Sequence, residues 1–213
     1  MIIKISEKKN NMEIKIYYGL SGALKGSTIE VEKERNPGIK VMESSIKPWK
    51  YYQFGLYNGR TEYNDLTYGI LHLVRLREFM NNNCSSEKLI VERGVTDSLF
   101  YYYYNSEFPS GKGVSEEPKF INDVVKAERS LLLPDFSKVE RILLIQNDKD
   151  FIRDVVLKDE YRKKTFNNSP ELYLSLQEKY ISFTTKYNAI DKIVRIDDAE
   201  DYIKSTLKTT YSS

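Results

Sequence analysis

An ordered alternation of apolar runs and amphipathic stretches is the feature that most constrains the fold of this 213-residue chain. Apolar runs of strand length, rich in β-branched and aromatic residues, recur five times, and stretches with apolar residues at helical spacing separate them. The predicted strands cover residues 13–19, 39–43, 88–94, 139–148 and 191–197. Strands that alternate with helices form a mainly parallel sheet, so we expect one α/β domain over residues 1–213.

Helices are predicted in the intervals between these strands, at residues 26–35, 64–81, 117–132, 150–164, 170–188 and 198–208. Residues 150–164 have the pattern of a single charged, amphipathic helix. Ser169-Pro170 is typical of a helix start, with serine at the cap and proline in the first turn. Thr96 or Asp97 is expected to cap a further helix that follows the third strand.

Composition excludes several classes of protein. Cys84 is the only cysteine and His72 the only histidine, so an internal disulfide and a zinc site are not expected. No run of about 18 apolar residues is present, and the first residues do not resemble a signal peptide, so we expect a cytoplasmic protein without a membrane span. A net charge of +2 gives no reason to expect a nucleic-acid partner.

The segment "GLSGALKGST", residues 19–28, lies between the first predicted strand and the first predicted helix. It is close to the phosphate-binding pattern G-x-x-x-x-G-K-[ST], but the last glycine and the lysine are exchanged. In such loops, backbone N–H groups and the helix N-terminus bind phosphates, the lysine reaches the β- and γ-phosphates, and the hydroxyl binds Mg²⁺. ATP and Mg²⁺ are therefore the expected ligands, and the candidate residues are Gly19, Ser21, Gly22, Ala23, Leu24, Lys25, Gly26, Ser27 and Thr28.

Two registers of this loop are open. Counted from Gly19, Lys25 takes the lysine position, but Leu24 replaces the last glycine and Gly26 replaces the hydroxyl residue. Counted back from residues 27–28, the hydroxyl is correct, but Gly26 stands where lysine belongs. A one-residue bulge at Gly26 would satisfy both roles. A glycine-rich turn with a solvated lysine is the alternative.

An acidic residue and an arginine end the third predicted strand, as Glu92-Arg93-Gly94, and Asp97 follows. With the loop, this order resembles the deoxynucleoside kinase and thymidylate kinase group of P-loop phosphotransferases. In an open α/β sheet, ligands bind beyond the carboxyl ends of the strands, where arginine can bind phosphate and a carboxylate can hold Mg²⁺. The alternative is a helix-capping acid beside a surface arginine.

The second predicted strand also ends in an acid, Glu43, and an aromatic stretch follows it. The resemblance implies that Glu43 is the general base on the acceptor hydroxyl, although Ser44 stands where the relatives have proline. Trp49 and Tyr52 could stack on a nucleobase, or they could pack beneath a loop.

A basic segment at about residues 150–168 is similar to the lid that closes over phosphates in this group. Arg162 and Lys163 are the lid candidates that would bind the nucleotide, with Lys164 and Arg153 as further cations. Cations there would neutralise charge on the transferring group. A solvated basic helix end is the alternative, and Tyr173 and Tyr180 beyond it are expected in the core.

The resemblance implies a three-layer fold with a five-stranded parallel sheet in the order 2-3-1-4-5 and helices on both faces. It also implies ATP-dependent phosphoryl transfer to a nucleoside or nucleoside monophosphate, with Lys25, Glu43 and Arg93 as catalytic residues. Arg93 and Asp97 would bind the acceptor, Ser27 and Glu92 would bind the metal, and a homodimer is an expectation. The open alternatives are a nucleotide-binding module without catalysis, a kinase of another small alcohol or a modified nucleobase, and an interaction protein with a tyrosine-rich surface.

Overall fold

A five-stranded, all-parallel sheet forms the centre of the computed structural model, which describes residues 12–43, 61–83, 85–100, 117–132 and 136–208. The strands are β1 (Glu13–Tyr18), β2 (Lys40–Met42), β3 (Lys88–Glu92), β4 (Lys138–Gln146) and β5 (Lys192–Ile196). They pair in the order β2-β3-β1-β4-β5, and every pairing is parallel. The predicted α/β fold and strand order are confirmed.

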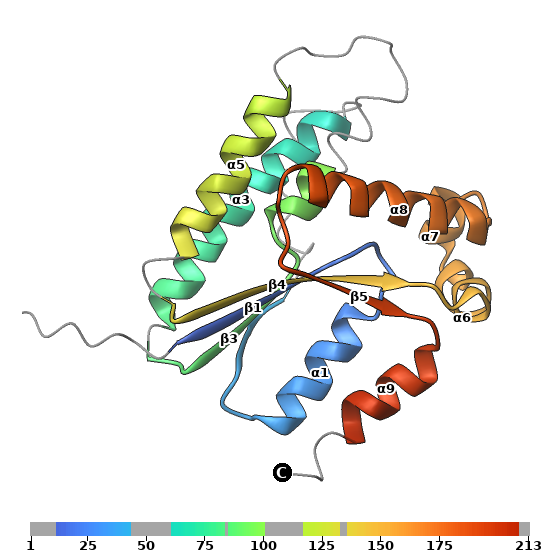
Figure 1. Cartoon of the computed structure of the whole chain (residues 1–213), viewed down its shortest axis with the longest axis horizontal. Coiled ribbons are helices and arrows are strands. Elements are labelled where there is room, and N and C mark those ends of the chain that lie inside the picture. Colours follow the sequence, from blue (N-terminus) through green and yellow to red (C-terminus); the bar gives the residue numbers. More distant parts are fainter. Residues whose placement is uncertain (1–11, 44–60, 84, 101–116, 133–135, 209–213) are drawn as a thin grey trace, which may run out of the picture.

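Helices cover both faces of this sheet, as Figure 1 shows. The helices include α1 (Lys25–Arg35), α3 (Thr61–Asn82), α5 (Glu117–Leu132), α6 (Lys149–Asp154), the 3-10 helix η2 (Val156–Lys158), α7 (Glu160–Thr165), α8 (Pro170–Lys186) and α9 (Ala199–Lys208). Helices α1 and α9 lie on one face, and α3, α5 and α8 lie on the other. The molecule therefore has three layers.

Two apolar clusters, one on each side of the sheet, explain why the central strand β1 has apolar residues on both of its faces. Ile14, Ile16 and Tyr18 of β1 belong to the larger cluster, which includes residues of α3, α5 and α8. Tyr17 points the other way and belongs to the smaller cluster, with Ile29 of α1. Side chains alternate between the faces of a strand, so a strand covered on both faces carries apolar residues on both of them.

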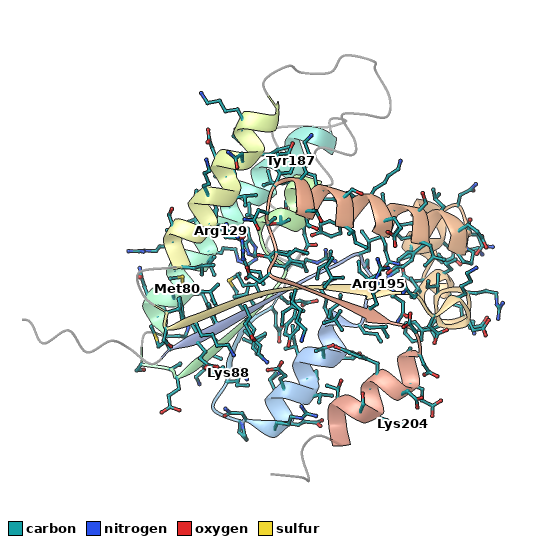
Figure 2. The ribbon with its side chains drawn as sticks, viewed as in Figure 1. Met80, Lys88, Arg129, Tyr187, Arg195 and Lys204 are labelled. Carbon is teal, nitrogen blue, oxygen red and sulfur yellow. The ribbon has the colours of Figure 1, made fainter. Side chains whose placement is uncertain are left out.

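An ionic group attaches α1 to the sheet. Glu32 of α1 accepts hydrogen bonds from Lys15 Nζ at 2.8 Å and from the hydroxyl of Tyr17. Lys88, the first residue of β3, is labelled in Figure 2, and its Nζ lies 3.2 Å from the other carboxylate oxygen of Glu32. Burial by itself would raise the pKa of Glu32, but the hydrogen bonds from Lys15 and Tyr17 outweigh burial and lower the pKa.

The prediction of one helix over residues 150–164 is wrong. The segment forms α6, η2 and α7 instead, because Val156 and Leu157 turn into the core and are fully or almost fully buried. Asp148 caps α6 by accepting from Phe151 N at 2.9 Å, and Asp159 begins the next turn by accepting from Arg162 N at 3.0 Å. Two local caps and a buried apolar pair divide a pattern that looks continuous in the sequence.

Candidate functional site

The loop between β1 and α1 has a shape that depends on its two glycines. Gly19 has φ +142°, and a Cβ there would lie 2.6 Å from the backbone oxygen of Leu144. Gly22 has φ +95°, and a Cβ there would lie 2.6 Å from Cγ1 of Val156. Any other residue at these positions would have to combine an unfavourable φ with a collision.

The register counted from Gly19 is the one that the chain adopts. Leu24 is the N-cap of α1 with φ 60°, a left-handed conformation that glycine adopts more readily, at the position where the usual pattern has its last glycine. Lys25 is the first residue of the helix. Gly26 is the exposed second residue of the helix and has no positive φ, so the bulge that would reconcile both registers is not formed.

The two hydroxyl residues after Gly26 face different surroundings. Thr28 Oγ1 donates to Leu24 O at 2.9 Å and lies 3.2 Å from the hydroxyl of Tyr202 in α9. Ser27 is exposed in the first turn of α1. Of these two candidates, Ser27 is the one with a hydroxyl open to a ligand.

Lys25 is buried within the loop itself, with 4% of its surface exposed. Its Nζ donates to Gly19 O at 2.6 Å and to Leu20 O at 2.9 Å. Burial lowers the pKa of Lys25 to about 7; Arg93 and Arg162 also lower it, whereas Asp97 and Glu92 raise it. An anion that enters the loop would meet an ammonium group already directed toward the loop backbone.

The acids at the ends of β2 and β3 lie on the same edge of the sheet as the loop. Met42 of β2 pairs with Val91 of β3, and Tyr17 of β1 pairs with Glu92 of β3. Glu92 is the last residue of β3, Glu43 directly follows β2, and Gly19 directly follows β1. Glu43 is exposed, and its backbone oxygen accepts from Arg75 of α3 at 3.2 Å. The candidates Trp49 and Tyr52 lie outside the described residues.

Arg93 connects β3 to the helical segment at residues 95–100. It has φ 68°, and its N–H donates to Tyr17 O at 2.9 Å, which continues the β1–β3 pairing by one bond. Gly94 lies against the ring of Tyr18, where a Cβ would come within 2.3 Å of Cε1. A side chain at position 94 would push this turn away from the loop.

Asp97 lies behind the loop and does not cap a helix. The prediction that Thr96 or Asp97 caps the following helix is wrong, because that helix already begins at residue 95. Asp97 is buried, and its Oδ1 accepts from Gly19 N at 3.2 Å and from the hydroxyl of Tyr180 at 2.5 Å.

The lid candidates differ in what they contact. Arg162 of α7 donates from Nε to Ser21 Oγ of the loop at 3.0 Å. Lys163 is exposed, and its Nζ lies 3.9 Å from Glu160. Arg153 is also exposed and is paired with acids of its own helix. Arg162 therefore contacts the loop, whereas Lys163 and Arg153 pair with acidic residues of their own helices.

Two tyrosines that the sequence places in the core also support the loop. Tyr173 and Tyr180 of α8 are fully buried, as expected. The hydroxyl of Tyr173 also donates to Ser21 O at 3.2 Å, and the hydroxyl of Tyr180 donates to Asp97. They are seven residues apart and so share one helix face. That spacing is visible in the sequence, but the partners of the hydroxyls are not.

His72 of α3 is a further residue whose surroundings the sequence does not reveal. It is buried, and its Nε2 has no hydrogen-bond partner within the described part of the chain. Burial, followed by the charges of Arg75 and Arg93, lowers the pKa of His72 to about 3. The imidazole is therefore neutral on the α3 side of the site.

Comparison with solved structures gives consistent matches over nearly the whole chain. Deoxyadenosine kinase from M. mycoides, solved with bound dATP, has a TM-score of 0.60 and 17% identity, covering 94% of this chain and 100% of that one. Thymidylate kinase from Candida albicans has a TM-score of 0.61 and 13% identity, covering 93% of this chain and 90% of that one. Thymidylate kinase from Ehrlichia chaffeensis has a TM-score of 0.51 and 11% identity, covering 93% and 98%.

The chain has the fold of nucleoside and nucleotide kinases. The resemblance inferred from the strand-end motifs is confirmed at the level of the fold. No family model matches the chain, and no curated protein matches its sequence.

In this kinase fold, the residues at the loop suit Mg²⁺ only together with phosphate. Among the residues that the structure describes, no three or more His, Cys, Asp or Glu side chains form a metal-binding group. Mg²⁺ usually keeps several waters and takes one or two carboxylates together with substrate phosphates. The exposed residue Ser27 and the carboxylate of Glu92 at the end of β3 are ligand types that suit such a partly hydrated Mg²⁺.

Within the described ranges, none of the helices is long and apolar enough to cross a membrane.

Proposed function

We propose that this chain is a kinase that transfers the γ-phosphoryl group of ATP to a nucleoside or a nucleoside monophosphate. The observation that carries the proposal is the position of Lys25. It is the first residue of α1, it is buried inside the loop, and this loop lies at the sheet edge where Glu43 follows β2 and Glu92 ends β3. Phosphoryl transfer needs such convergence of cations, backbone donors and carboxylates around the phosphates.

The nucleotide would be held by the chain's own loop and lid. The free N–H groups at the start of α1 and the ammonium of Lys25 would bind the β- and γ-phosphates. Ser27 and Glu92 would hold Mg²⁺, which neutralises charge on the phosphates when bound. Arg162 and Lys163 would close over the phosphates from the side of α7.

In the transfer step, an acceptor oxygen forms a bond to the γ-phosphorus, and the bond between that phosphorus and the β–γ bridging oxygen breaks. ADP leaves with the electron pair. If the acceptor is a nucleoside, its hydroxyl proton goes to the carboxylate of Glu43. If the acceptor is a monophosphate, the attacking oxygen is already ionised and needs no base. Arg93 would hold the acceptor or its phosphate, and Trp49 and Tyr52 would stack on its base.

The test is ADP formation from ATP and Mg²⁺ across a panel of nucleosides and nucleoside monophosphates. We expect turnover with at least one acceptor, and a loss of roughly 100-fold or more in Lys25→Ala with the circular dichroism spectrum retained. Glu43→Gln should impair transfer to a nucleoside and leave transfer to a monophosphate nearly unchanged. If wild type exceeds the Lys25→Ala background with none of the acceptors, the kinase proposal is wrong.

A second candidate function is a nucleotide-binding module without catalysis. The observation that favours it is Gly26, which occupies the position of the usual metal-binding hydroxyl and does not bulge to bring Ser27 there. Gly26→Ser separates the two candidates. If wild type binds ATP without turnover and this variant gains turnover, the chain is a binding module. If wild type already turns over, the chain is a kinase that does not need a hydroxyl at position 26. Transfer to another small alcohol or a modified nucleobase would appear in the same assay when the panel is extended.

A further inference from the structure

The turn that carries Arg93 has a backbone conformation that needs support. Arg93 has φ 68°, in the left-handed region that residues with a side chain adopt reluctantly. Its N–H donates to Tyr17 O at 2.9 Å, so strand β1 holds the residue on one side. The chain then enters the helical segment at residue 95, and a second support of the turn has to come from that end.

Glu128 of α5 supplies the support at that end. Arg129, the next residue of α5, is labelled in Figure 2 and marks this part of the helix. Oε1 of Glu128 accepts from Val95 N at 2.9 Å, and Oε2 accepts from the hydroxyl of Tyr18 at 3.0 Å. The ring of Tyr18 lies against Gly94 and leaves no room for a Cβ there. One side chain therefore fixes the turn twice, directly at Val95 and through Tyr18 at Gly94.

Core packing does not explain a carboxylate in this position. Glu128 is 1% exposed, and Tyr18 and Val95 are fully buried. Burial raises the pKa of Glu128, and the hydrogen bond from Val95 N is the largest effect that opposes burial. The charge of Arg141 also acts on Glu128, but its guanidinium is hydrogen-bonded to Asp191, with Nε 2.9 Å from Oδ2. An apolar side chain would fill the same space without the cost of burying an acid, so the carboxylate contributes through its bonds to the turn.

Glu32 of α1 is a matched acid on the opposite face of β1. It is also buried, and it accepts from the hydroxyl of Tyr17 as Glu128 accepts from that of Tyr18. Its further partners are the ammonium groups of two lysines. Glu128 has a backbone N–H of the turn as its second partner instead. The two acids therefore share burial and a tyrosine partner, and they differ in whether they contact the turn after β3.

We propose that Glu128 is a positioning residue that holds the turn at Arg93 in the conformation needed to bind the acceptor. The role rests on the proposed function, in which Arg93 holds the acceptor or its phosphate. Without the bonds of Glu128, the turn loses its support at residues 94 and 95, and Arg93 can relax toward a negative φ. A change in φ turns the Cα–Cβ bond of Arg93 and so displaces its guanidinium. A misplacement of about 1 Å is enough to weaken transfer strongly.

The test is a double-mutant cycle on the acceptor kcat/KM at saturating ATP and Mg²⁺, with the common deoxynucleosides and their 5′-monophosphates as acceptors. Glu128→Leu fills the space and removes both bonds, and we expect it to lower kcat/KM by roughly 10-fold or more. Arg93→Asn removes the guanidinium and keeps the turn, because asparagine tolerates a positive φ. In that background Glu128→Leu should cost less than about 2-fold, since its effect passes through Arg93.

Two variants separate positioning from general stability. Glu128→Gln keeps an oxygen for Val95 N, and its amide can donate to the hydroxyl oxygen of Tyr18, so most of the wild-type kcat/KM should be retained. Glu32→Leu removes the matched acid. It should lower the urea midpoint, as Glu128→Leu does, and leave the acceptor kcat/KM close to that of wild type. If Glu128→Leu does not fold, Glu128→Ala replaces it, because water can enter the space and pair with both donors, and the same loss of kcat/KM is expected.

The positioning role is overturned if the folded Glu128 variant keeps the wild-type acceptor kcat/KM, or if its full loss persists in the Arg93→Asn background. Either result leaves the kinase proposal standing. If wild type phosphorylates no acceptor, the same cycle is measured by calorimetry on the Kd of each nucleoside and monophosphate. A Kd that the Glu128 variant raises only when Arg93 is present supports the positioning role while the kinase proposal fails. If none of these compounds binds, both proposals are overturned.

Discussion

Backbone conformation decides which side chains are tolerated in the loop and in the first turn of α1, as Leu24, Gly22 and Gly26 show. Leu24 accepts a left-handed conformation at the helix cap, where its side chain packs against the smaller apolar cluster. Gly22 has both a positive φ and a neighbour, Val156, that blocks a side chain. Gly26 is an ordinary helical residue, and a Cβ there would meet nothing within 4 Å. The two glycines should therefore respond in opposite directions to the same substitution.

We expect Gly22→Ala to lower the free energy of unfolding by at least about 1 kcal/mol, because alanine would be strained at this φ and would collide with Val156. Gly26→Ala should raise it by about 0.5–1 kcal/mol, since alanine favours a helix interior over glycine. Urea denaturation of both variants measures the difference. Equal effects of the two substitutions would contradict the loop geometry.

Lys25 should take up a proton when ATP binds. Burial holds its pKa at about 7 in the free chain, and bound phosphates would raise that pKa by favouring the charged form. At pH 8, binding should therefore be accompanied by uptake of close to one proton. Titration calorimetry in two buffers of different ionisation enthalpy measures this uptake. Lys25→Met should abolish it, and an uptake of zero in wild type would contradict the burial of the ammonium.

The same shift makes the stability of the free chain depend on pH. Between pH 7 and about 10.5, the unfolded chain binds a proton at Lys25 that the folded chain has lost. Stability should therefore rise with pH across this window, and Lys25→Met should flatten the rise. The slope of the urea midpoint against pH, compared between wild type and Lys25→Met, tests this sign.

At the scale of elements, α1 depends on Glu32 for its contact with the sheet. We expect Glu32→Gln to destabilise the chain by roughly 3 kcal/mol, because it leaves the buried hydroxyl of Tyr17 and the ammonium groups of Lys15 and Lys88 without their anion. Urea denaturation gives the value. Glu30→Gln, which removes the exposed partner of Lys33 on the same helix, is the control and should change little. Equal losses in both variants would argue against the buried group.

The segment from α6 to α7 shows where a helical pattern misleads. Residues 150–164 have helical spacing throughout. However, Val156 packs next to Gly22, and Asp159 caps a new turn by accepting a hydrogen bond from Arg162 N. That interruption is what brings Arg162 to Ser21. A continuous helix would carry its cations along a straight axis, so the break itself positions the lid candidate.

At the scale of the whole molecule, the strand order gathers three strand ends at one edge. A ligand that binds there should stabilise the entire domain, because it binds only the folded chain. At an ATP concentration of about 100 times Kd, the gain is about 2.7 kcal/mol, which should raise the Tm by roughly 5–10 °C for a domain of this size. Thermal denaturation with ATP and Mg²⁺ measures it. Lys25→Met should remove most of the shift, and a wild-type shift of zero would favour the interaction-protein alternative.

The sequence by itself determined the α/β class, the five strands and the polar residues at their ends, because these depend on local periodicity and on apolar runs buried on both faces. It also located the loop, although both registers remained open. Only the tertiary structure decided the register, since Leu24 can cap α1 only if the surrounding core supports a left-handed residue there. The same holds for Asp97, Tyr173, Tyr180 and Arg162. Their partners lie from 78 to 152 residues away in the chain, and no local pattern encodes which side chains the crossovers bring together.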